Sequence, residues 1–298
     1  MTLRLATRRS PLAIAQAESV AARLVGAGVD VELVEVVTRG DRDASAPLSE
    51  IGGEGAFVVE VQRAVLEGRA DGAVHSAKDL PSTTPAGLVL SAVPERRDPA
   101  DAMVGSTLDR LGPGATVATG SPRRRALVLS RRPDLRVVGL RGNMDRRLAA
   151  AGRDGVDAVV VATAALERLA RVEEIAERLD PSWFTPQVGQ GAIAIESRED
   201  DPATLHALGA IDDEAAHAAV TAERSFLAEL AAGCNAPLGA LARVEGGVVR
   251  LAGVMLALDG EASARGELAG TDPRAIGVAL ARHLRDDRGG AGLAGWAP

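Results

Sequence analysis

The 298-residue sequence has no tyrosine and contains only three phenylalanines, two tryptophans and one cysteine. With so few aromatic side chains, the hydrophobic cores must be built from Ala, Val and Leu, and stacking on nucleobases is not expected. One cysteine excludes an internal disulfide framework and is typical of a reducing compartment. There is neither an apolar run long enough to cross a membrane nor a signal-peptide core at the N-terminus. We therefore expect a cytoplasmic protein without a membrane partner.

The motifs of several common cofactor sites are also missing. The four histidines are scattered and give no metal-ligand spacing with the cysteine, so we expect no metal site. The sequence has neither a Walker loop nor a dinucleotide fingerprint. Its net charge of −7 argues against nucleic acid as a partner. Arginines are nevertheless clustered along the chain, which indicates a cleft for small anionic ligands.

The first two-thirds of the chain alternates predicted strands and helices, as in mostly parallel α/β sheets. Strands are predicted at residues 3–7, 29–37, 72–75, 101–104, 115–118, 136–140 and 158–162. Helices are predicted at residues 10–25, 57–67, 122–130, 144–151 and 164–169. A second unit begins near Asp98, and residues 193–196 are predicted to form a strand that crosses back to the first unit.

The last third has a different pattern. A long helix is predicted from about residue 213 to 232, and three strands follow at residues 238–244, 248–258 and 261–268. Tight turns containing glycine join these strands, and a final helix opens at Asp272. This order predicts a small α+β domain with an antiparallel sheet.

Two similar segments each follow a strand and open a helix, one around Ser10 and the other around Ser121. In both segments the serine is a candidate N-cap and a proline stands at the first helical position. Free N–H groups at a helix N-terminus bind anions, and the arginines beside these serines would add bidentate charge. Ordinary helix capping is the alternative. Arginine at a helix N-terminus opposes the helix dipole, so its presence there needs a functional reason. We therefore favour an anion site between the two lobes.

Asp79 and Cys234 are the candidate chemical groups. Asp79 lies beside Lys78 after the strand at residues 72–75, where a carboxylate could stabilise a developing cation or move a proton. A turn-capping role before Pro81 is the alternative. Cys234 follows Gly233 at the end of the long helix, on a turn where a thiolate could react. The alternative for Cys234 is a small, buried and inert residue.

Six ordered segments share the pattern of one enzyme family. They are residues 6–13, 37–41, 74–81, 140–143, 188–192 and 233–239. With them the chain resembles the porphobilinogen deaminase, or hydroxymethylbilane synthase, family from Leu5 to the end of the last helix.

The resemblance implies a fold of three domains. Domain 1 would comprise residues 1–94 and 192–210, domain 2 residues 97–188, and domain 3 residues 213–298. The first two would be α/β lobes like those of periplasmic binding proteins, with mostly parallel sheets. The third would be the small C-terminal α+β domain with an antiparallel sheet, and it would carry Cys234.

The resemblance also implies an activity in tetrapyrrole (haem) biosynthesis. Such a transferase joins four porphobilinogen molecules head to tail into hydroxymethylbilane and releases ammonia at each addition. A dipyrromethane cofactor, attached by a thioether to Cys234, primes the growing linear polypyrrole. No metal is needed, and the family suggests a monomer.

The family pattern assigns roles to individual residues. Asp79 matches the catalytic aspartate, which would contact pyrrole N–H groups and stabilise the cation formed when ammonia leaves. The residues implied to bind the cofactor are Cys234, Lys78, Ser76, Thr119, Ser121, Arg123, Arg124 and Arg147. The residues implied to bind the substrate are Arg8, Ser10, Gln16, Arg141, Arg168 and Phe57.

One segment departs from the family pattern. Glu50 and Glu54 stand in the predicted loop at residues 39–56, where the family often has lysine, so we expect no usual contact between this loop and the growing chain. The competing hypothesis is a cytoplasmic anion-binding receptor or regulator on the same two lobes. It predicts a reversibly bound ligand and an inert Cys234.

Overall fold

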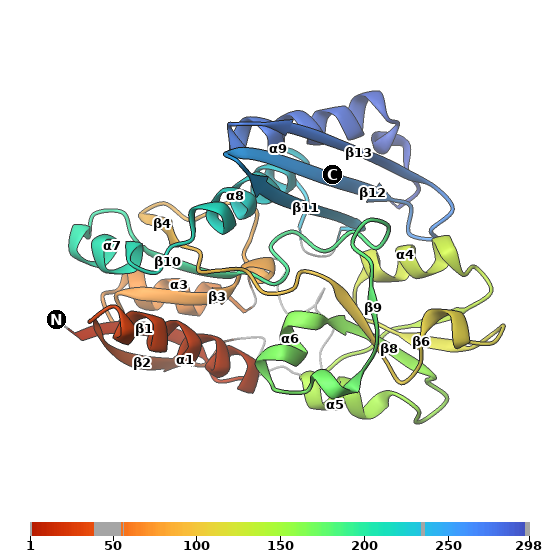
Figure 1. Cartoon of the computed structure of the whole chain (residues 1–298), viewed down its shortest axis with the longest axis horizontal. Coiled ribbons are helices and arrows are strands. Elements are labelled where there is room, and N and C mark those ends of the chain that lie inside the picture. The colour runs from red at the N-terminus through yellow and green to blue at the C-terminus, as the bar shows by residue number, and fades with distance from the viewer. Residues whose placement is uncertain (1, 39–54, 56, 234–235, 296–298) are drawn as a thin grey trace.

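The structure is a computed structural model that describes residues 2–38, 55, 57–233 and 236–295. Three β-sheets organise the described residues into two lobes that lie side by side and a third unit that covers their junction (Figure 1). Most of the predicted loop at residues 39–56, and Cys234 itself, lie outside the described residues. Among the described helices, none is both long and apolar enough to span a bilayer.

The first lobe contains a five-stranded sheet in the order β2-β1-β3-β10-β4. β1 pairs in parallel with β2 and β3, whereas β10 is antiparallel to both of its neighbours. α1 and α7 cover one face of the sheet and α3 covers the other. The bounds are β1 Thr2–Arg8, α1 Pro11–Gly26, β2 Asp30–Val36, α3 Val59–Leu66, β3 Gly72–Ser76, β4 Leu88–Ala92, β10 Ile193–Arg198 and α7 Pro202–Gly209.

The second lobe repeats this plan, with strand order β7-β6-β8-β5-β9. Here β5 is the reversed strand, antiparallel to β8 and β9, and the pairs of β6 with β7 and β8 are parallel. α4 packs on one face, and α5 and α6 pack on the other. The bounds are β5 Asp101–Val104, β6 Thr116–Ala118, α4 Pro122–Arg131, β7 Arg136–Val138, α5 Met144–Ala150, β8 Ala158–Ala162, α6 Thr163–Arg168 and β9 Ile175–Leu179.

The reversed strand of each lobe is the one that arrives from the other lobe. The chain leaves β4 in the first lobe to form β5 in the second, and it returns from β9 to form β10. This confirms that residues 193–196 cross back, and with four strands in one direction per sheet it confirms the mostly parallel prediction. Three elements, β4, β9 and α7, were not predicted; β9 is an edge strand in which exposed residues alternate with part-buried or buried ones.

The third unit is the predicted α+β domain with an antiparallel sheet, in the order β11-β12-β13. Helices α8 and α9 pack against this sheet around Phe226 and Leu280, both fully buried. Val254 and Leu256 of β12 extend into the core of the second lobe, so the third unit is joined to it by apolar packing. The bounds are α8 Glu214–Glu229, β11 Leu238–Glu245, β12 Val248–Leu256, β13 Ser263–Gly270 and α9 Pro273–Arg282. The domain boundaries given above stay a prediction.

Candidate functional site

A short turn at the end of β3 carries three of the predicted site residues. Ser76 ends the strand, and Lys78 and Asp79 lie in the 3₁₀ turn η1 (Ala77–Asp79) that follows it. The amide of Ala77 donates to the carbonyl of Ala192 at 3.1 Å, which fixes the turn to the chain entering β10. Ala77 and Leu80 are buried beneath the turn, whereas Asp79 is exposed. The turn therefore presents Asp79 outward from a buried support.

Gly189 packs directly against the back of this turn. It has a φ of +73°, and a Cβ at this position would lie 2.8 Å from the carbonyl carbon of Ala77 and 2.9 Å from the amide nitrogen of Lys78. Only glycine combines this backbone conformation with so close an approach. The sequence motif around Gly189 therefore has a structural reason, because it lets the turn and the crossover segment touch.

The N-terminus of α4 carries the second group of predicted residues, and its capping is as predicted. The side chain of Ser121 accepts a hydrogen bond from the amide of Arg124 at 3.4 Å, as Ser10 does from Ala13 at 3.3 Å at the start of α1. The hydroxyl of Thr119 is buried and accepts from the amide of Ser121 at 3.3 Å. Both prolines stand at the first helical positions.

Arg123 and Arg124 share one buried carboxylate, Asp101 at the start of β5. Asp101 is fully buried and lies 2.7 Å from a terminal nitrogen of each guanidinium. Burial alone would raise the pKa of Asp101, but the charges of Arg123 and Arg124, with hydrogen bonds from Arg123 and Gln190, hold that pKa below its usual value. The pair of arginines is thus anchored by an ionised group in the core of the second lobe.

Arg123 differs from the expectation of a residue facing the ligand. It is 1% exposed, its guanidinium donates to Asp101 and to the carbonyl of Thr185, and it lies over the ring of Phe184. Arg124 is 6% exposed and also donates to the carbonyl of Val160. Arg123 thus braces the second lobe in this structure, while Arg124 is the one whose charge acts on Lys78 of the first lobe.

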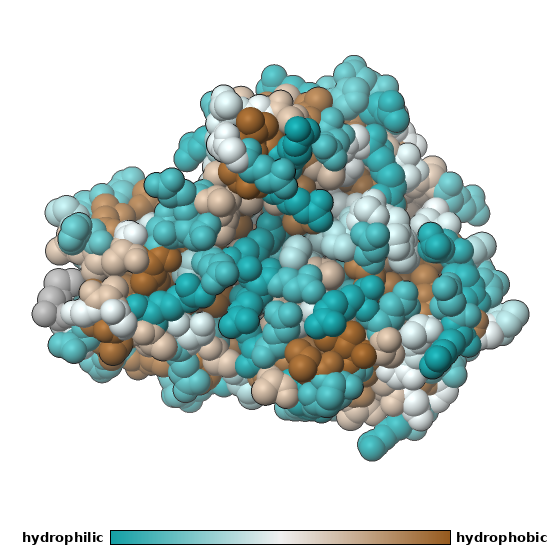
Figure 2. Space-filling view, viewed as in Figure 1, coloured by the Kyte–Doolittle hydropathy of each residue, from teal (hydrophilic) through white to brown (hydrophobic). Residues whose placement is uncertain are grey.

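Several positive charges converge where the two lobes meet. Burial lowers the pKa of Lys78 to about 8; Arg124 and Arg147 lower it further, while Asp79 and Asp101 oppose this. Burial also lowers the pKa of Arg147, with contributions from Arg124 and Arg141 and opposition from Asp79. These electrostatic couplings bring together residues from η1, α4 and α5. Along this junction Figure 2 shows hydrophilic side chains gathered between the lobes.

Further predicted residues lie on β1, on α1 and on the segment before α3. The guanidinium carbon of Arg8 lies 4.2 Å from the centre of the Phe57 ring, a cation–π contact that joins β1 to the segment before α3. Gln16 is 3% exposed, and its amide nitrogen has no hydrogen-bond partner among the described residues. A buried donor of this kind is costly unless a ligand or water satisfies it.

Arg168 lies at the end of α6 and lines a separate hollow of about 170 Å³ between the lobes. Its guanidinium donates to the carbonyl of Gly191 at 2.7 Å. Burial, and then the charge of Arg97, lowers the pKa of Arg168 to about 10, against the opposing charge of Glu167. The remaining walls of the hollow come from α1 and from the crossover around Pro94.

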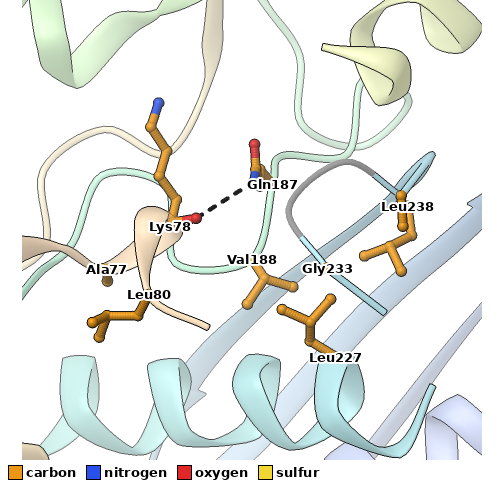
Figure 3. Close-up of a pocket in the computed structure, with 9 residues that line it drawn as sticks. Ala77, Lys78, Leu80, Gln187, Val188, Leu227, Gly233 and Leu238 are labelled. Carbon is orange, nitrogen blue, oxygen red and sulfur yellow. Dashed lines mark hydrogen bonds between the residues drawn. The ribbon is translucent and has the colours of Figure 1, made fainter. Parts of the chain in front are cut away.

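A small pocket joins the Asp79 turn to the residues that flank Cys234. Ala77, Lys78 and Leu80 line one side, and Gly233 lines the other (Figure 3). Ala236 is also among the lining residues. Figure 3 also shows Leu227 of α8 beneath the pocket, with the Lys78 side chain extending away toward the lobe junction. The side-chain amide nitrogen of Gln187 donates to the carbonyl of Lys78 at 3.5 Å. Cys234 lies outside the described residues, but its described neighbours adjoin the turn of Asp79.

Two buried polar residues with no predicted role form hydrogen bonds that link the three units. Gln190 donates to Asp101 at 3.0 Å and its carbonyl accepts from Arg96 at 2.9 Å. Glu223 of α8 is fully buried and accepts hydrogen bonds from Arg96, Gly189 and the amide of Ala242 in β11. Gln190 belongs to the family segment at residues 188–192, but the sequence assigned it no role. Nothing in the sequence indicated that Glu223 is a buried hydrogen-bonding residue, because its partners are distant in the sequence. Among the described residues, no group of three or more His, Cys, Asp or Glu is arranged to hold a metal ion.

Comparison with known proteins assigns both parts of the chain to one family. Residues 3–206 match "Porphobilinogen deaminase, dipyromethane cofactor binding domain", and residues 217–286 match "Porphobilinogen deaminase, C-terminal domain". The chain is 46% identical over 301 residues to the porphobilinogen deaminase of Roseiflexus castenholzii, covering 99% of each chain. It is 43% identical over 284 residues to that of Brevibacillus brevis, covering 93% of this chain and 92% of the relative.

Among solved structures, the methionine binding protein MetQ matches 72% of this chain and 91% of its own, with 15% identity and a TM-score of 0.44. The two family domains together span nearly the whole sequence, in the predicted order. The first of them is a cofactor-binding domain, which confirms the prediction of dipyrromethane. By both its domains and its full-length relatives, the chain belongs to the porphobilinogen deaminase family.

Proposed function

We propose that this chain polymerises four porphobilinogen molecules head to tail into hydroxymethylbilane, releasing ammonia at each addition. One observation carries the proposal: a single pocket is lined both by the residues that flank Cys234 and by the turn that bears Lys78 and Asp79. A primer attached to that thiol would start beside the carboxylate. The family membership makes the alternative of a reversible anion receptor unnecessary, and we do not retain it.

Lys78 of this pocket and the arginines whose charges act on it fit a dipyrromethane group. Such a group carries several carboxylates, and Lys78, Arg124 and Arg147 bring three cations to the lobe junction with mutual repulsion. A carboxylated ligand would relieve that repulsion and favour protonated Lys78. Cys234 is the only cysteine in the sequence and therefore the only thiol that can form the thioether. When bound, this group supplies the primer to which substrate is added.

The protein residues then have separable tasks. Lys78, Arg124 and Arg147 would hold carboxylates of the primer, with Ser76, Thr119 and Ser121 as hydrogen-bonding partners. Arg8, Ser10, Gln16, Arg141, Arg168 and Phe57 would receive the incoming porphobilinogen. Arg123 would act with Asp101 to hold Arg124 in place, because its two terminal nitrogens donate to Asp101 and to the carbonyl of Thr185.

Asp79 is the proposed catalytic residue. As the carbon–nitrogen bond of the protonated aminomethyl group breaks, ammonia leaves with the electron pair and the positive charge passes to the substrate carbon. The carboxylate of Asp79 stands on an exposed turn with buried support, so it can face that cation and stabilise it. After the new carbon–carbon bond forms, the same carboxylate can accept the proton lost from the pyrrole.

We further propose that the protein works as a cytoplasmic monomer with the three domain ranges given above. The single cysteine supports a reducing compartment, and the family resemblance supports the monomer. The role of the loop at residues 39–56 stays a prediction, since most of it lies outside the described residues.

Intact mass spectrometry tests the proposal most directly. The purified protein should exceed its sequence mass by two pyrrole units and give a colour with Ehrlich's reagent, and Cys234→Ala should lose both signals together with activity. Incubation with porphobilinogen separates an unloaded enzyme, which gains the mass, from a protein of other function. A bare mass that porphobilinogen leaves unchanged, or a loaded and active Cys234→Ala variant, contradicts the proposal.

A further inference from the structure

A second buried polar cluster lies behind the Asp79 turn, on the face of the first sheet that packs under α3 and α8. Its centre is Glu196 of β10, which is 0% exposed. His75 of β3, Gln62 of α3 and Arg224 of α8 surround it, and all three are buried. None of these residues has a task in the mechanism above. Burying a carboxylate without neutralising its charge costs free energy. The presence of this cluster therefore calls for a structural or functional explanation.

The contacts of Glu196 identify it as a charged centre. The amide nitrogen of Gln62 donates to Oε2 of Glu196 at 2.7 Å, and Nε2 of His75 lies 3.4 Å from the same oxygen. Burial would raise the pKa of Glu196, but the adjacent His75, the hydrogen bond from Gln62 and the charge of Arg224 hold it below the usual value. Glu196 is therefore the anion around which the other three side chains are arranged.

Two members of the cluster lie at opposite ends of the segment that contains Lys78 and Asp79. His75 is the penultimate residue of β3, just before the turn. Arg224 donates to the carbonyl of Pro81 at 2.9 Å and to the hydroxyl of Thr84 at 3.2 Å, just after the turn. The turn thus lies between His75 and the residues bound by Arg224, and both His75 and Arg224 interact electrostatically with Glu196.

We propose that Glu196, His75 and Arg224 are positioning residues, which hold the turn of Lys78 and Asp79 in register with the substrate. The proposal rests on the proposed function, since it assigns Asp79 the catalytic role. The three residues act through the backbone and do not touch the reacting atoms. A displacement of about 1 Å at a reacting group can reduce a rate on the order of a hundredfold, so a loosened turn should slow the chemical step.

The charge of Glu196 can be removed with little change in volume by Glu196→Gln. Ser197→Ala is the matched control, because Ser197 is also fully buried on β10 and loses a comparable contact, a 2.6 Å hydrogen bond to Ser91. Its side chain points to the opposite face of the sheet, away from the turn. Each variant is checked for cofactor by intact mass, for thermal midpoint, and for kcat and KM with porphobilinogen.

We expect Glu196→Gln to retain its cofactor and a KM within about twofold, with kcat lowered at least about tenfold. Hydrogen exchange of the amides at residues 76–84 should be faster than in the parent protein. Ser197→Ala should change neither kcat nor exchange in this segment, even with an equal loss in thermal midpoint. Equal effects of the two variants, or an unchanged kcat in folded Glu196→Gln, would overturn the proposal.

Arg224 supplies an independent test if Glu196→Gln does not fold. Arg224→Lys keeps the charge beside Glu196 and should retain most of kcat, whereas Arg224→Met should lose it while KM stays similar. Identical kcat values for these two variants refute the positioning role. A parent protein that fails to convert porphobilinogen would instead refute the proposed function, and hydrogen exchange would still report whether the cluster holds the turn.

Discussion

Lys78 is the only lysine in the chain, so its ionisation can be measured without interference from any other lysine. Its pKa is lowered from 10.5 to about 8, first by burial and then by the charge of Arg124. We predict that competitive labelling of the cofactor-free Cys234→Ala protein will follow a titration with a midpoint near this lowered pKa. The labelled Lys78 peptide is quantified by mass spectrometry across pH and separated there from the N-terminal amine.

The size of the effect follows from the two pKa values. One pKa unit corresponds to about 1.4 kcal/mol, so the shift to about 8 corresponds to about 3 kcal/mol of unfavourable interaction for the charged amine. Because the folded-state pKa lies below the unfolded value, folding bears this cost in full below pH 8. The cost disappears as the pH rises from about 8 towards 10.5. Lys78→Met in the same cofactor-free background should therefore raise the free energy of unfolding at pH 7 by up to about 3 kcal/mol.

Two further measurements would show whether this reasoning holds. Arg147→Met removes a neighbouring positive charge and should move the labelling midpoint upwards, while the protein unfolded in denaturant should titrate near the ordinary lysine value. In the cofactor-loaded protein the carboxylates should also raise the midpoint. A folded, cofactor-free protein whose Lys78 titrates near 10.5 would refute the description of the lobe junction as a site of converging positive charge.

Three other substitutions test the site. Asp79→Asn should keep the fold and cofactor but lower kcat by at least about a hundredfold, because it removes the exposed carboxylate that we propose stabilises the substrate cation; near-normal turnover would remove Asp79 from that role. Asp101→Asn leaves Arg123 and Arg124 without their shared buried anion and should lower the free energy of unfolding by about 3–5 kcal/mol in chemical denaturation; a loss below 1 kcal/mol would contradict the ion-pair assignment. Gly189→Ala places a Cβ at φ +73° against the Lys78 turn and should destabilise the protein by about 1–3 kcal/mol, with a parallel loss of kcat; unchanged values of both would show that the turn tolerates displacement.

Much of the architecture could be predicted from local sequence patterns. Ser10 and Ser121, each followed by proline, predicted two helix starts, and both serines accept the expected capping hydrogen bonds. These signals are readable because a cap involves residues only three positions apart. The crossing strand predicted at residues 193–196 is present as β10. β9 was missed because an edge strand with alternating exposed residues gives little apolar signal.

The family motifs identified the candidate site residues, but they could not predict which side chains each residue contacts. Arg123 and Arg124 are adjacent in the sequence and both donate to Asp101, but Arg123 also donates to Thr185, whereas Arg124 also donates to Val160 and Gln190. These partners lie between 22 and 66 residues away in the sequence, and the charge of Arg124 also lowers the pKa of Lys78. No pattern within one helix contains that information.

The sequence by itself determined most of the strands and helices, the two capped helix starts, the family and the single thiol, because these depend on neighbouring residues or on motif identity. Only the tertiary structure decided which carboxylates are buried and what they hold. Glu196 meets Gln62 across 134 residues, and Glu223 meets Arg96 across 127. A buried charge is stabilised only by partners that folding brings to it, so its role becomes visible when those distant segments are in contact.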